Sequence, residues 1–377
     1  MFLKNIFNLT QHLPTPLLVL DTAKVRDNID RIRRALPQAE LFYAVKCNPD
    51  HRLLEAVRLA GAGFEIASRS EAETVLQLGV APERIICLHP IKAPEFLRFL
   101  HGRGIEVLAA DGVHELDKIA EYAPGSRIVL RISVPNEGSI VPLNRKFGVE
   151  PQAVVRLFRH ACERGLHPYG LTIHVGSQCE RLETWRAALS VCQQVCAEAR
   201  QNGLPLSFIS LGGGLPAPYT NDALSLDAVG QTVQAMLPQL LSSSDCILSI
   251  EPGRAIAASA GVLISTVTGL AERADGQWAY LDAGVYHGLL EAARIGGGQI
   301  PYPVTAGNPE REPQIYNLAG PTCDSFDLPF ERLRLPELRV GDRVAVHCAG
   351  AYSTALASTF NGFPAPVVYA LDQLEAG

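Results

Sequence analysis

Several side chains capable of covalent chemistry or phosphate binding come directly after short apolar runs of the sequence. Lys46 follows the run 41–45 without a break, and Gly212–Gly214 follow the run 207–211. A lysine amine in apolar surroundings can have a lowered pKa and form a Schiff base with a carbonyl compound. Three successive glycines expose backbone N–H groups with no side chains in the way, which suits a phosphate. The combination indicates pyridoxal phosphate, the cofactor that needs both.

Each of these features also has a plainer interpretation. Lys46 could be a rim lysine paired with an acid such as Glu65, and the glycines could form only a tight turn. His174 could be a core histidine whose ring nitrogens are satisfied internally. Glu251 and Arg254, in the string Glu-Pro-Gly-Arg, could form an internal ion pair. The residue types alone leave both interpretations open.

The elements that carry these side chains alternate between strand-like and helix-like patterns. Eight runs rich in β-branched and aromatic residues are separated by amphipathic stretches of helical period, which indicates parallel strands connected by helices. Eight such units fit a (β/α)8 barrel, in which catalytic groups lie at the carboxyl ends of the strands. A dinucleotide-binding sheet is disfavoured because no glycine-rich fingerprint follows the first run. The eight runs are 41–45, 63–67, 84–88, 105–109, 127–132, 170–175, 207–211 and 246–250.

The pattern changes after Arg254, and the rest of the chain is expected to form a second domain that is mainly β. We therefore predict an α/β protein with a TIM-like (β/α)8 barrel over 22–260 and a C-terminal β-sandwich or β-barrel domain over 261–377. A further strand at 15–21 could join the second domain. The strand-like segments of that domain are 261–268, 277–282, 314–318, 338–347 and 366–371.

Seven strings of the sequence closely resemble the fold-type III pyridoxal-phosphate decarboxylases, the family of ornithine, lysine, arginine and diaminopimelate decarboxylases. They occur in the family's order and with compatible spacing over nearly the whole chain. GPTCD together with STFNGF is most similar to the ornithine decarboxylase branch. The strings are FYAVKCNPD (42–50), HVGSQC (174–179), LGGGLP (211–216), EPGR (251–254), GPTCDSFD (320–327), GAYS (350–353) and STFNGF (358–363).

The resemblance implies a role for each matching residue. Lys46 would hold the cofactor covalently, Glu251 would keep its pyridine nitrogen protonated, and His174 would stack on the ring. Cys323 would protonate the α-carbon after carbon dioxide leaves, and Asp324 would contact the distal amine of the substrate. Both would reach into the partner's site across a head-to-tail homodimer. The phosphate would be bound by Ser177, Gly213, Gly214, Arg254 and Tyr352, while Glu65 and Arg131 would support the ring and its lysine.

One position departs from the ornithine decarboxylase pattern. That branch has a substrate-binding acid in an N-D-G-V-Y string, whereas this sequence reads LDAGVY over 281–286. Ala283 therefore falls on the acidic position and Asp282 lies one residue earlier. A one-residue slip along a strand turns a side chain to the other face, so Asp282 is a candidate substrate contact but not an equivalent one.

These observations give three functional hypotheses. The first is pyridoxal-phosphate-dependent decarboxylation of a basic L-amino acid, ornithine or lysine first, to a diamine and carbon dioxide, as in polyamine biosynthesis. The second keeps the reaction but takes a conjugated amino acid of siderophore or polyamine biosynthesis. The third is a catalytically silent regulatory homologue. The joint presence of Lys46, His174, Glu251, Cys323 and Tyr352 argues against the third.

The composition is that of an ordinary soluble globular protein. The 377 residues are 47% hydrophobic and 19% charged, and the net charge of -6 argues against a nucleic acid partner. No apolar run is long enough to span a membrane, and no secretory signal is visible. Nine irregularly spaced cysteines are typical of reduced thiols, so we expect a cytoplasmic protein without a metal site.

Overall fold

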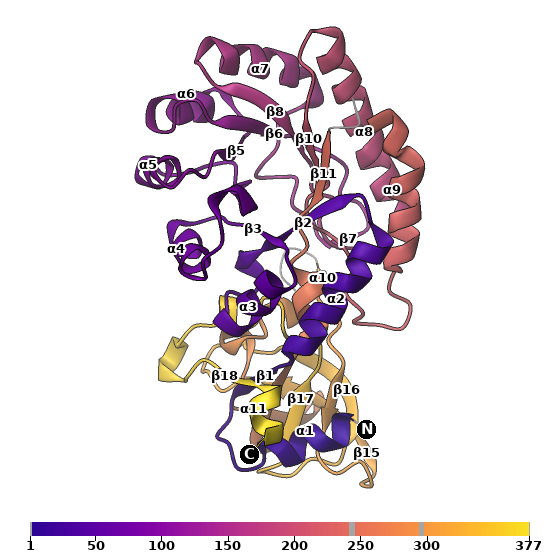
Figure 1. Ribbon diagram of the computed structural model, residues 1–377. Helices are drawn as coiled ribbons and strands as arrows, with labels where there is room; N and C mark the ends of the chain where they lie inside the picture. The colour runs from indigo at the N-terminus through magenta and orange to yellow at the C-terminus, as the bar shows by residue number, and fades with distance from the viewer. Residues whose placement is uncertain (1, 241–245, 294–297, 377) are drawn as a thin grey trace. The chain divides into compact units, whose positions relative to one another are not determined.

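The computed structural model describes residues 2–240, 246–293 and 298–376, which form two compact units (Figure 1). The barrel unit comprises Arg26–Pro216 and Leu224–Gly253. The sheet unit comprises Met1–Val25, Ala217–Ala223 and Arg254–Gly377. Residues 22–25, 217–223 and 254–260, which the sequence assigned to the barrel, therefore group with the sheet unit.

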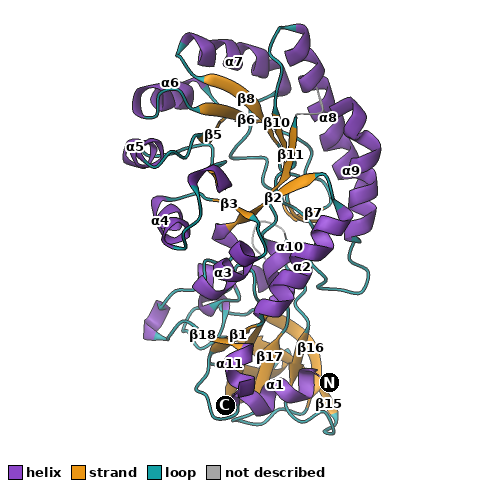
Figure 2. Cartoon of the chain, in the orientation of Figure 1, coloured by secondary structure: helices purple, strands orange, loops and turns teal. Residues whose placement is uncertain are grey.

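The barrel unit is built on eight parallel strands in the order β4-β3-β2-β11-β10-β8-β6-β5. A parallel bridge between Cys87 and Leu108 joins the two ends of this order and closes the barrel. Helices α4 to α9 lie around the outside of the strands (Figure 2), so the predicted TIM-like barrel is confirmed. The strands are β2 (Ala39–Ala44), β3 (Gly63–Glu65), β4 (Ile85–Ile86), β5 (Val107–Ala110), β6 (Arg127–Arg131), β8 (His167–Thr172), β10 (Phe208–Ser210) and β11 (Ile247–Ile250).

The helices occur where the apolar periodicity predicts them. Ser68 caps α4 by accepting a hydrogen bond from the Glu71 N–H, and the Glu71 carboxylate accepts one from the Ala67 N–H. This reciprocal capping fixes the turn that follows Glu65 at the end of β3. No helix of the described chain has both the length and the apolar character needed to cross a membrane. The helices are α2 (Thr22–Ala35), α3 (His51–Leu59), α4 (Arg69–Gln77), α5 (Pro94–Gly102), α6 (Val113–Tyr122), α7 (Val154–Glu163), α8 (Leu182–Gln201) and α9 (Leu226–Leu240).

A buried apolar cluster drawn from several strands fills part of the barrel unit. Full burial of such a side chain stabilises the fold by roughly 1.5–3 kcal/mol, so the cluster fixes the strands below their carboxyl ends. A short antiparallel pair, β7 (Ser139–Val141) with β9 (Ser177–Cys179), adds to this unit. The members of the cluster are Phe42, Ile86, Leu88, Val107, Ala109, Val129 and Phe208.

The sheet unit is a mixed, barrel-like sheet in the order β14-β17-β12-β13-β15-β16. Strand β1 (Leu17–Leu20) joins it, antiparallel to β12 and parallel to β18. The unit also contains α1 (Phe2–Thr10), α10 (Arg254–Ala257) and α11 (Leu371–Ala376). Its other strands are β12 (Gly261–Arg273), β13 (Gly276–Leu281), β14 (Val304–Ala306), β15 (Pro313–Ala319), β16 (Phe330–Pro336), β17 (Arg343–Val346) and β18 (Val367–Ala370).

One predicted strand of the sheet unit is shorter than expected. The segment 338–347 contains only β17, because its first half forms a turn. Gly341 has a φ of 92° there, and the Asp342 carboxylate accepts a hydrogen bond of 2.7 Å from the Arg339 N–H. Strands β14 and β16 lie outside the segments that the sequence indicated.

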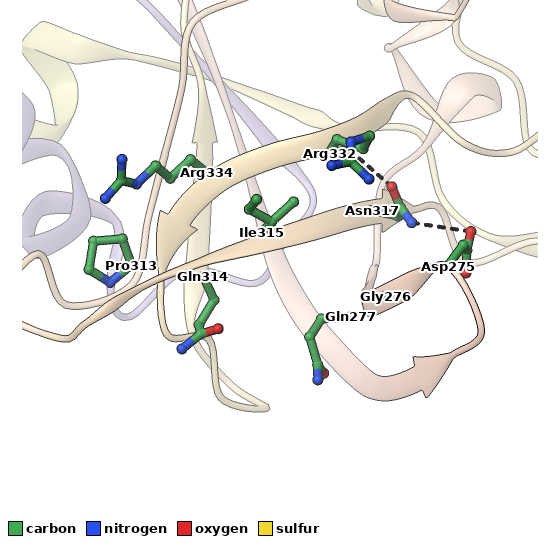
Figure 3. Close-up of a pocket in the computed structure, with 9 residues that line it drawn as sticks. All are labelled: Asp275, Gly276, Gln277, Pro313, Gln314, Ile315, Asn317, Arg332 and Arg334. Carbon is green, nitrogen blue, oxygen red and sulfur yellow. Dashed lines mark hydrogen bonds between the residues drawn. The ribbon is translucent and has the colours of Figure 1, made fainter.

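A pocket of about 520 Å³ in the sheet unit is lined by residues of β13, β15 and β16 and of the turn before β13. Figure 3 shows these lining residues. Asn317 lies between two of its polar neighbours: its amide donates to Asp275, and its oxygen accepts from the Arg332 N–H. The lining contains no lysine, histidine or cysteine, so the predicted chemistry lies elsewhere.

A glycine in α9 provides a test of the packing. We expect Gly230→Ala to destabilise the protein, because an added Cβ would lie 2.8 Å from the carbonyl carbon of Ala35. Overpacking costs about 1–3 kcal/mol, which exceeds the gain of about 1 kcal/mol in helix propensity. Gly102→Ala is the control, since nothing lies within 4 Å of an added Cβ there. Urea unfolding should give a lower midpoint for Gly230→Ala only; equal midpoints for both variants would contradict the packing described.

Candidate active site

A cavity of about 300 Å³ lies in the barrel unit, lined by residues at the carboxyl ends of its strands and by the segment 142–147. It brings together five of the residues predicted from the sequence, namely Lys46, Glu65, Arg131, His174 and Glu251. The other lining residues are Ala67, Leu88, His89, Pro142, Leu143, Arg145, Lys146 and Phe147.

Lys46 lies in a single turn that directly follows β2, between the buried residues Val45 and Cys47. Its Nζ is 2.6 Å from Oε2 of Glu65, whose side chain is 3% exposed. The side chain of Lys46 is itself 45% exposed and lines the cavity. The ion pair expected from the plainer interpretation is therefore present, and it orients the amine without removing it from the cavity.

Glu251 follows β11 and is almost completely buried. Its Oε1 accepts hydrogen bonds from the hydroxyls of Ser210 and Thr172. Burial raises the pKa of Glu251 to about 7, and the nearby Glu65 adds to this increase, against the opposing effects of Ser210, Lys46 and Arg131. A buried carboxylate of this kind gains stability from an N–H donor, so its chemistry fits a protonated pyridine nitrogen.

His174 presents a neutral ring. Burial lowers its pKa well below the usual value, and the positive charges of Arg131 and Lys46 lower it further. Its Nδ1 accepts a hydrogen bond of 3.0 Å from the Gly176 N–H, which fixes the ring orientation. An added Cβ at Gly213 would lie 3.0 Å from Nε2 of His174. Only glycine leaves this space beside the ring free.

Two glycines of the triplet have backbone conformations that favour glycine. Gly212 has a φ of 66° and Gly214 a φ of 106°, a region that side chains disfavour. An added Cβ at Gly214 would lie 2.5 Å from the carbonyl oxygen of Gly176. Backbone N–H groups and a hydroxyl, from Ser177 at the start of β9, suit phosphate oxygens. Together with Lys46 and Glu251, this set of groups fits pyridoxal phosphate.

Arg254 lies in the sheet unit, in an ion pair that the sequence did not indicate. Its guanidinium forms two hydrogen bonds with Glu291, of 2.8 and 2.6 Å, and a third of 3.0 Å with the Tyr219 hydroxyl. It also lies 4.8 Å from the centre of the Tyr352 ring. The sequence suggested Glu251 as its partner, and the carboxylate that pairs with it within the sheet unit is that of Glu291. The roles of Arg254 and Tyr352 toward phosphate stay predictions.

Cys323 and Asp324 lie together on an exposed loop of the sheet unit. The Cys323 thiol is 3.2 Å from Oδ1 of Asn361, which links the GPTCD string to the STFNGF string. Asp324 accepts a hydrogen bond of 2.5 Å from the Tyr286 hydroxyl, and the Phe326 N–H and this hydroxyl lower its pKa. The buried carboxylate of Asp327 holds the loop by accepting hydrogen bonds from backbone and hydroxyl groups.

Asp282 is engaged inside the sheet unit. Its Oδ1 accepts hydrogen bonds of 2.6 Å from the Ser265 hydroxyl and 2.9 Å from the Thr266 N–H. Its Oδ2 accepts a further one from the Thr15 hydroxyl, and Ala283 beside it is fully buried. These contacts disfavour Asp282 as a substrate contact, a role that stays a prediction.

The sequence reasoning assigned no role to several residues of the two units. His89, which lines the cavity, follows the strand-like run 84–88, and Arg145, Lys146 and Phe147 lie in a segment without strand or helix periodicity. Ser210, a partner of Glu251, reads as an ordinary strand residue. Nothing in the sequence pattern indicated Glu291 as the partner of Arg254.

Comparisons with known proteins agree with this geometry. Residues 22–258 match the family model described as pyridoxal-dependent decarboxylase, pyridoxal binding domain. The chain is 32% identical to the lysine/ornithine decarboxylase of Selenomonas ruminantium, over 99% of this chain and 94% of the relative. It is 33% identical to antizyme inhibitor 2 of Xenopus laevis, over 90% and 78%. The structure of a Vibrio vulnificus lysine/ornithine decarboxylase complexed with putrescine superposes with a TM-score of 0.87 and 32% identity, over 98% of both chains.

The family model covers the barrel with its cavity, and the relatives align with nearly the whole chain. On this evidence, the chain belongs to the pyridoxal-dependent decarboxylases of fold type III, in their ornithine/lysine branch.

Proposed function

We propose that this protein decarboxylates a basic L-amino acid, with ornithine and lysine as first candidates, to the corresponding diamine and carbon dioxide. The proposal rests on one observation. Lys46, paired with Glu65, lines the same cavity as the buried Glu251 and the neutral His174. The names of the relatives support the same substrate class. The reaction would belong to polyamine biosynthesis.

Pyridoxal phosphate, when bound, supplies a ring that delocalises the electron pair left on the α-carbon as carbon dioxide departs. In the proposed mechanism, the Lys46 amine holds the cofactor, and Glu65 orients that amine at 2.6 Å. The buried Glu251 carboxylate would accept a hydrogen bond from a protonated ring nitrogen, and the neutral His174 would contact the ring without adding charge. Ser177, Gly213 and Gly214 bind the phosphate.

Cys323 is the proposed proton donor to the α-carbon, and Asp324 the proposed contact to the distal amine. Both are exposed on the loop that Asp327 anchors. The loop and its surroundings carry exposed apolar side chains, including those of Phe326 and Phe360. Such exposed apolar side chains are typical of an interaction surface. We therefore propose a homodimer in which this loop completes the partner's site.

A second candidate is the decarboxylation of a conjugated amino acid, as in siderophore or polyamine biosynthesis. Ala283 is buried and the Asp282 carboxylate is engaged internally. Arg145 and Lys146 line the cavity, and neither pairs with a carboxylate among the described residues. Cations without a carboxylate partner at the cavity would attract a substrate whose distal group is anionic more strongly than they would attract a diamino acid.

A third candidate is a regulatory role, which the similarity to antizyme inhibitor 2 supports. The predicted residues that line the cavity argue against this role.

All nine cysteines are free thiols, which supports a reducing compartment such as the cytoplasm.

The test is carbon dioxide release by the purified, cofactor-loaded protein from ornithine, lysine, arginine, diaminopimelate, carboxynorspermidine and citryl-diaminopropionate. Turnover of ornithine or lysine supports the first candidate. Turnover of the conjugates alone replaces it with the second. Bound cofactor without release from any compound favours the regulatory role.

A shared site predicts complementation between two inactive variants. Lys46→Ala and Cys323→Ala should each lose nearly all activity, and their mixed dimers should recover about a quarter of it, because half of the dimers are mixed and half of their sites are intact. Cys162→Ala, at another exposed cysteine, is the control and should keep full activity. No recovery in the mixture, with mixed dimers demonstrated, would assign each site to one chain.

The raised pKa of Glu251 predicts a pH-dependent stability of the cofactor-free protein. The folded state holds an extra proton between the ordinary carboxyl pKa and about 7. The contribution of Glu251 to stability should therefore be greatest below that range and fall as the pH rises through about 7.

Relative to Glu251→Gln, we expect the wild type to lose roughly 3 kcal/mol between pH 4.5 and pH 8. Chemical denaturation at several pH values measures the difference. Glu163→Gln, at an exposed position of α7, should follow the wild type. Parallel curves for wild type and Glu251→Gln would mean that Glu251 ionises normally.

A further inference from the structure

A second buried charge lies beside the cavity and is not explained by the proposed mechanism. Lys92, in the segment between β4 and α5, has a side chain with 0% exposure. Its Nζ donates to the carbonyl oxygens of His89, Pro90 and Ala109, at 3.0, 3.3 and 2.6 Å. It also lies 3.1 Å from Oε1 of Glu115 in α6.

The ion pair with Glu115 does not by itself explain a buried lysine at this position. Removing an ammonium and a carboxylate from water costs several kcal/mol each, and a well-packed apolar pair is often as stable. An apolar side chain at residue 92 could not satisfy the three carbonyl oxygens, however, and a buried carbonyl without a donor is itself unfavourable. The contacts of Lys92 therefore define the path of the backbone that carries those carbonyls.

That backbone carries one wall of the cavity. His89 lines the cavity, and its ring lies edge-on to Phe147 with ring centres 5.4 Å apart. Phe147 in turn lies 5.4 Å from the guanidinium of Arg131 and 4.9 Å from the amine of Lys146. A shift of the His89 backbone would therefore move His89 and Phe147 together.

We propose that Lys92 is a positioning residue of the active site: by holding the carbonyls of His89 and Pro90, it places the His89 ring in the wall of the cofactor cavity. The inference concerns the cofactor and not the proposed substrate. Its test therefore uses binding without turnover and can fail or succeed independently of the proposed reaction.

The state of the His89 ring agrees with this role. Burial lowers its pKa, and the charge of Lys92 lowers it further, as do Lys46 and Lys146, while Glu65 opposes them. Held in place, His89 is a neutral imidazole that adds a polar surface to the cavity without adding charge.

The test is a double-mutant cycle on cofactor affinity, measured by titrating cofactor-free protein with pyridoxal phosphate and following absorbance. Lys92→Met and His89→Ala should each weaken binding about tenfold, and the double variant should bind no more weakly than either one, as expected of coupled residues. Effects that multiply in the double variant, or single variants that bind normally, would overturn the proposal. In histidine-labelled protein, the NMR titration of His89 should shift to a higher pKa in Lys92→Met; an unchanged pKa also counts against the proposal.

Two further variants separate positioning from charge compensation. Lys118→Met removes a more exposed lysine that also pairs with Glu115, and it should leave affinity unchanged. Lys92→Met combined with Glu115→Gln removes both charges of the buried pair, and it should fold even if Lys92→Met alone does not. We expect this pair to keep the tenfold loss. Recovery of full affinity would show that Lys92 only neutralises Glu115 and would refute the inference.

Discussion

The buried carboxylate of Glu251 is the constraint on which the arrangement of the cavity depends. A carboxylate enclosed by a barrel is unfavourable unless its oxygens are hydrogen bonded and its charge is balanced. Two hydroxyls from neighbouring strands, Thr172 and Ser210, provide the hydrogen bonds. Lys46 and Arg131 provide positive charge at a distance, and Glu65 offsets part of it. Burial and Glu65 still leave the pKa of Glu251 raised, so a protonated ring nitrogen, as proposed above, would stabilise its ionised form.

The barrel solves the related problem of holding several charges in one place. Each charged side chain comes from the end of a different strand or from the segment that follows it, and the apolar cluster below keeps the strand ends at fixed separations. Glycine at 212–214 keeps space that any side chain would fill. Strand ends thus carry the groups proposed to bind the cofactor, whereas the thiol and the carboxylate at 323 and 324 are carried by a loop anchored at one buried aspartate.

Sequence patterns predicted the barrel well because each of its elements has a strong local signal. Lys46, His174 and Glu251 could be identified because each lies at the end of a strand-like run within a recognisable string. The sheet unit was less predictable: Gly341 ends a run that reads as a strand, and β14 has only three residues. The partner of Arg254 could not be found, since Glu291 lies 37 positions away with no periodic relation to it. Contacts of this kind are created by the fold and leave no mark on the local sequence.

The closure of the barrel has a consequence for how the protein moves. Its seam consists of the two-residue strand β4 and one bridge to β5, between Cys87 and Leu108. The ammonium of Lys92 spans the same seam, because it binds carbonyls after β4 and the Ala109 carbonyl in β5. Where the backbone pairing between β4 and β5 is short, the Lys92 side chain thus adds hydrogen bonds between the two sides. Amide hydrogens along this seam are expected to exchange through local separation of β4 from β5, and a cofactor that binds only the closed barrel would slow their exchange.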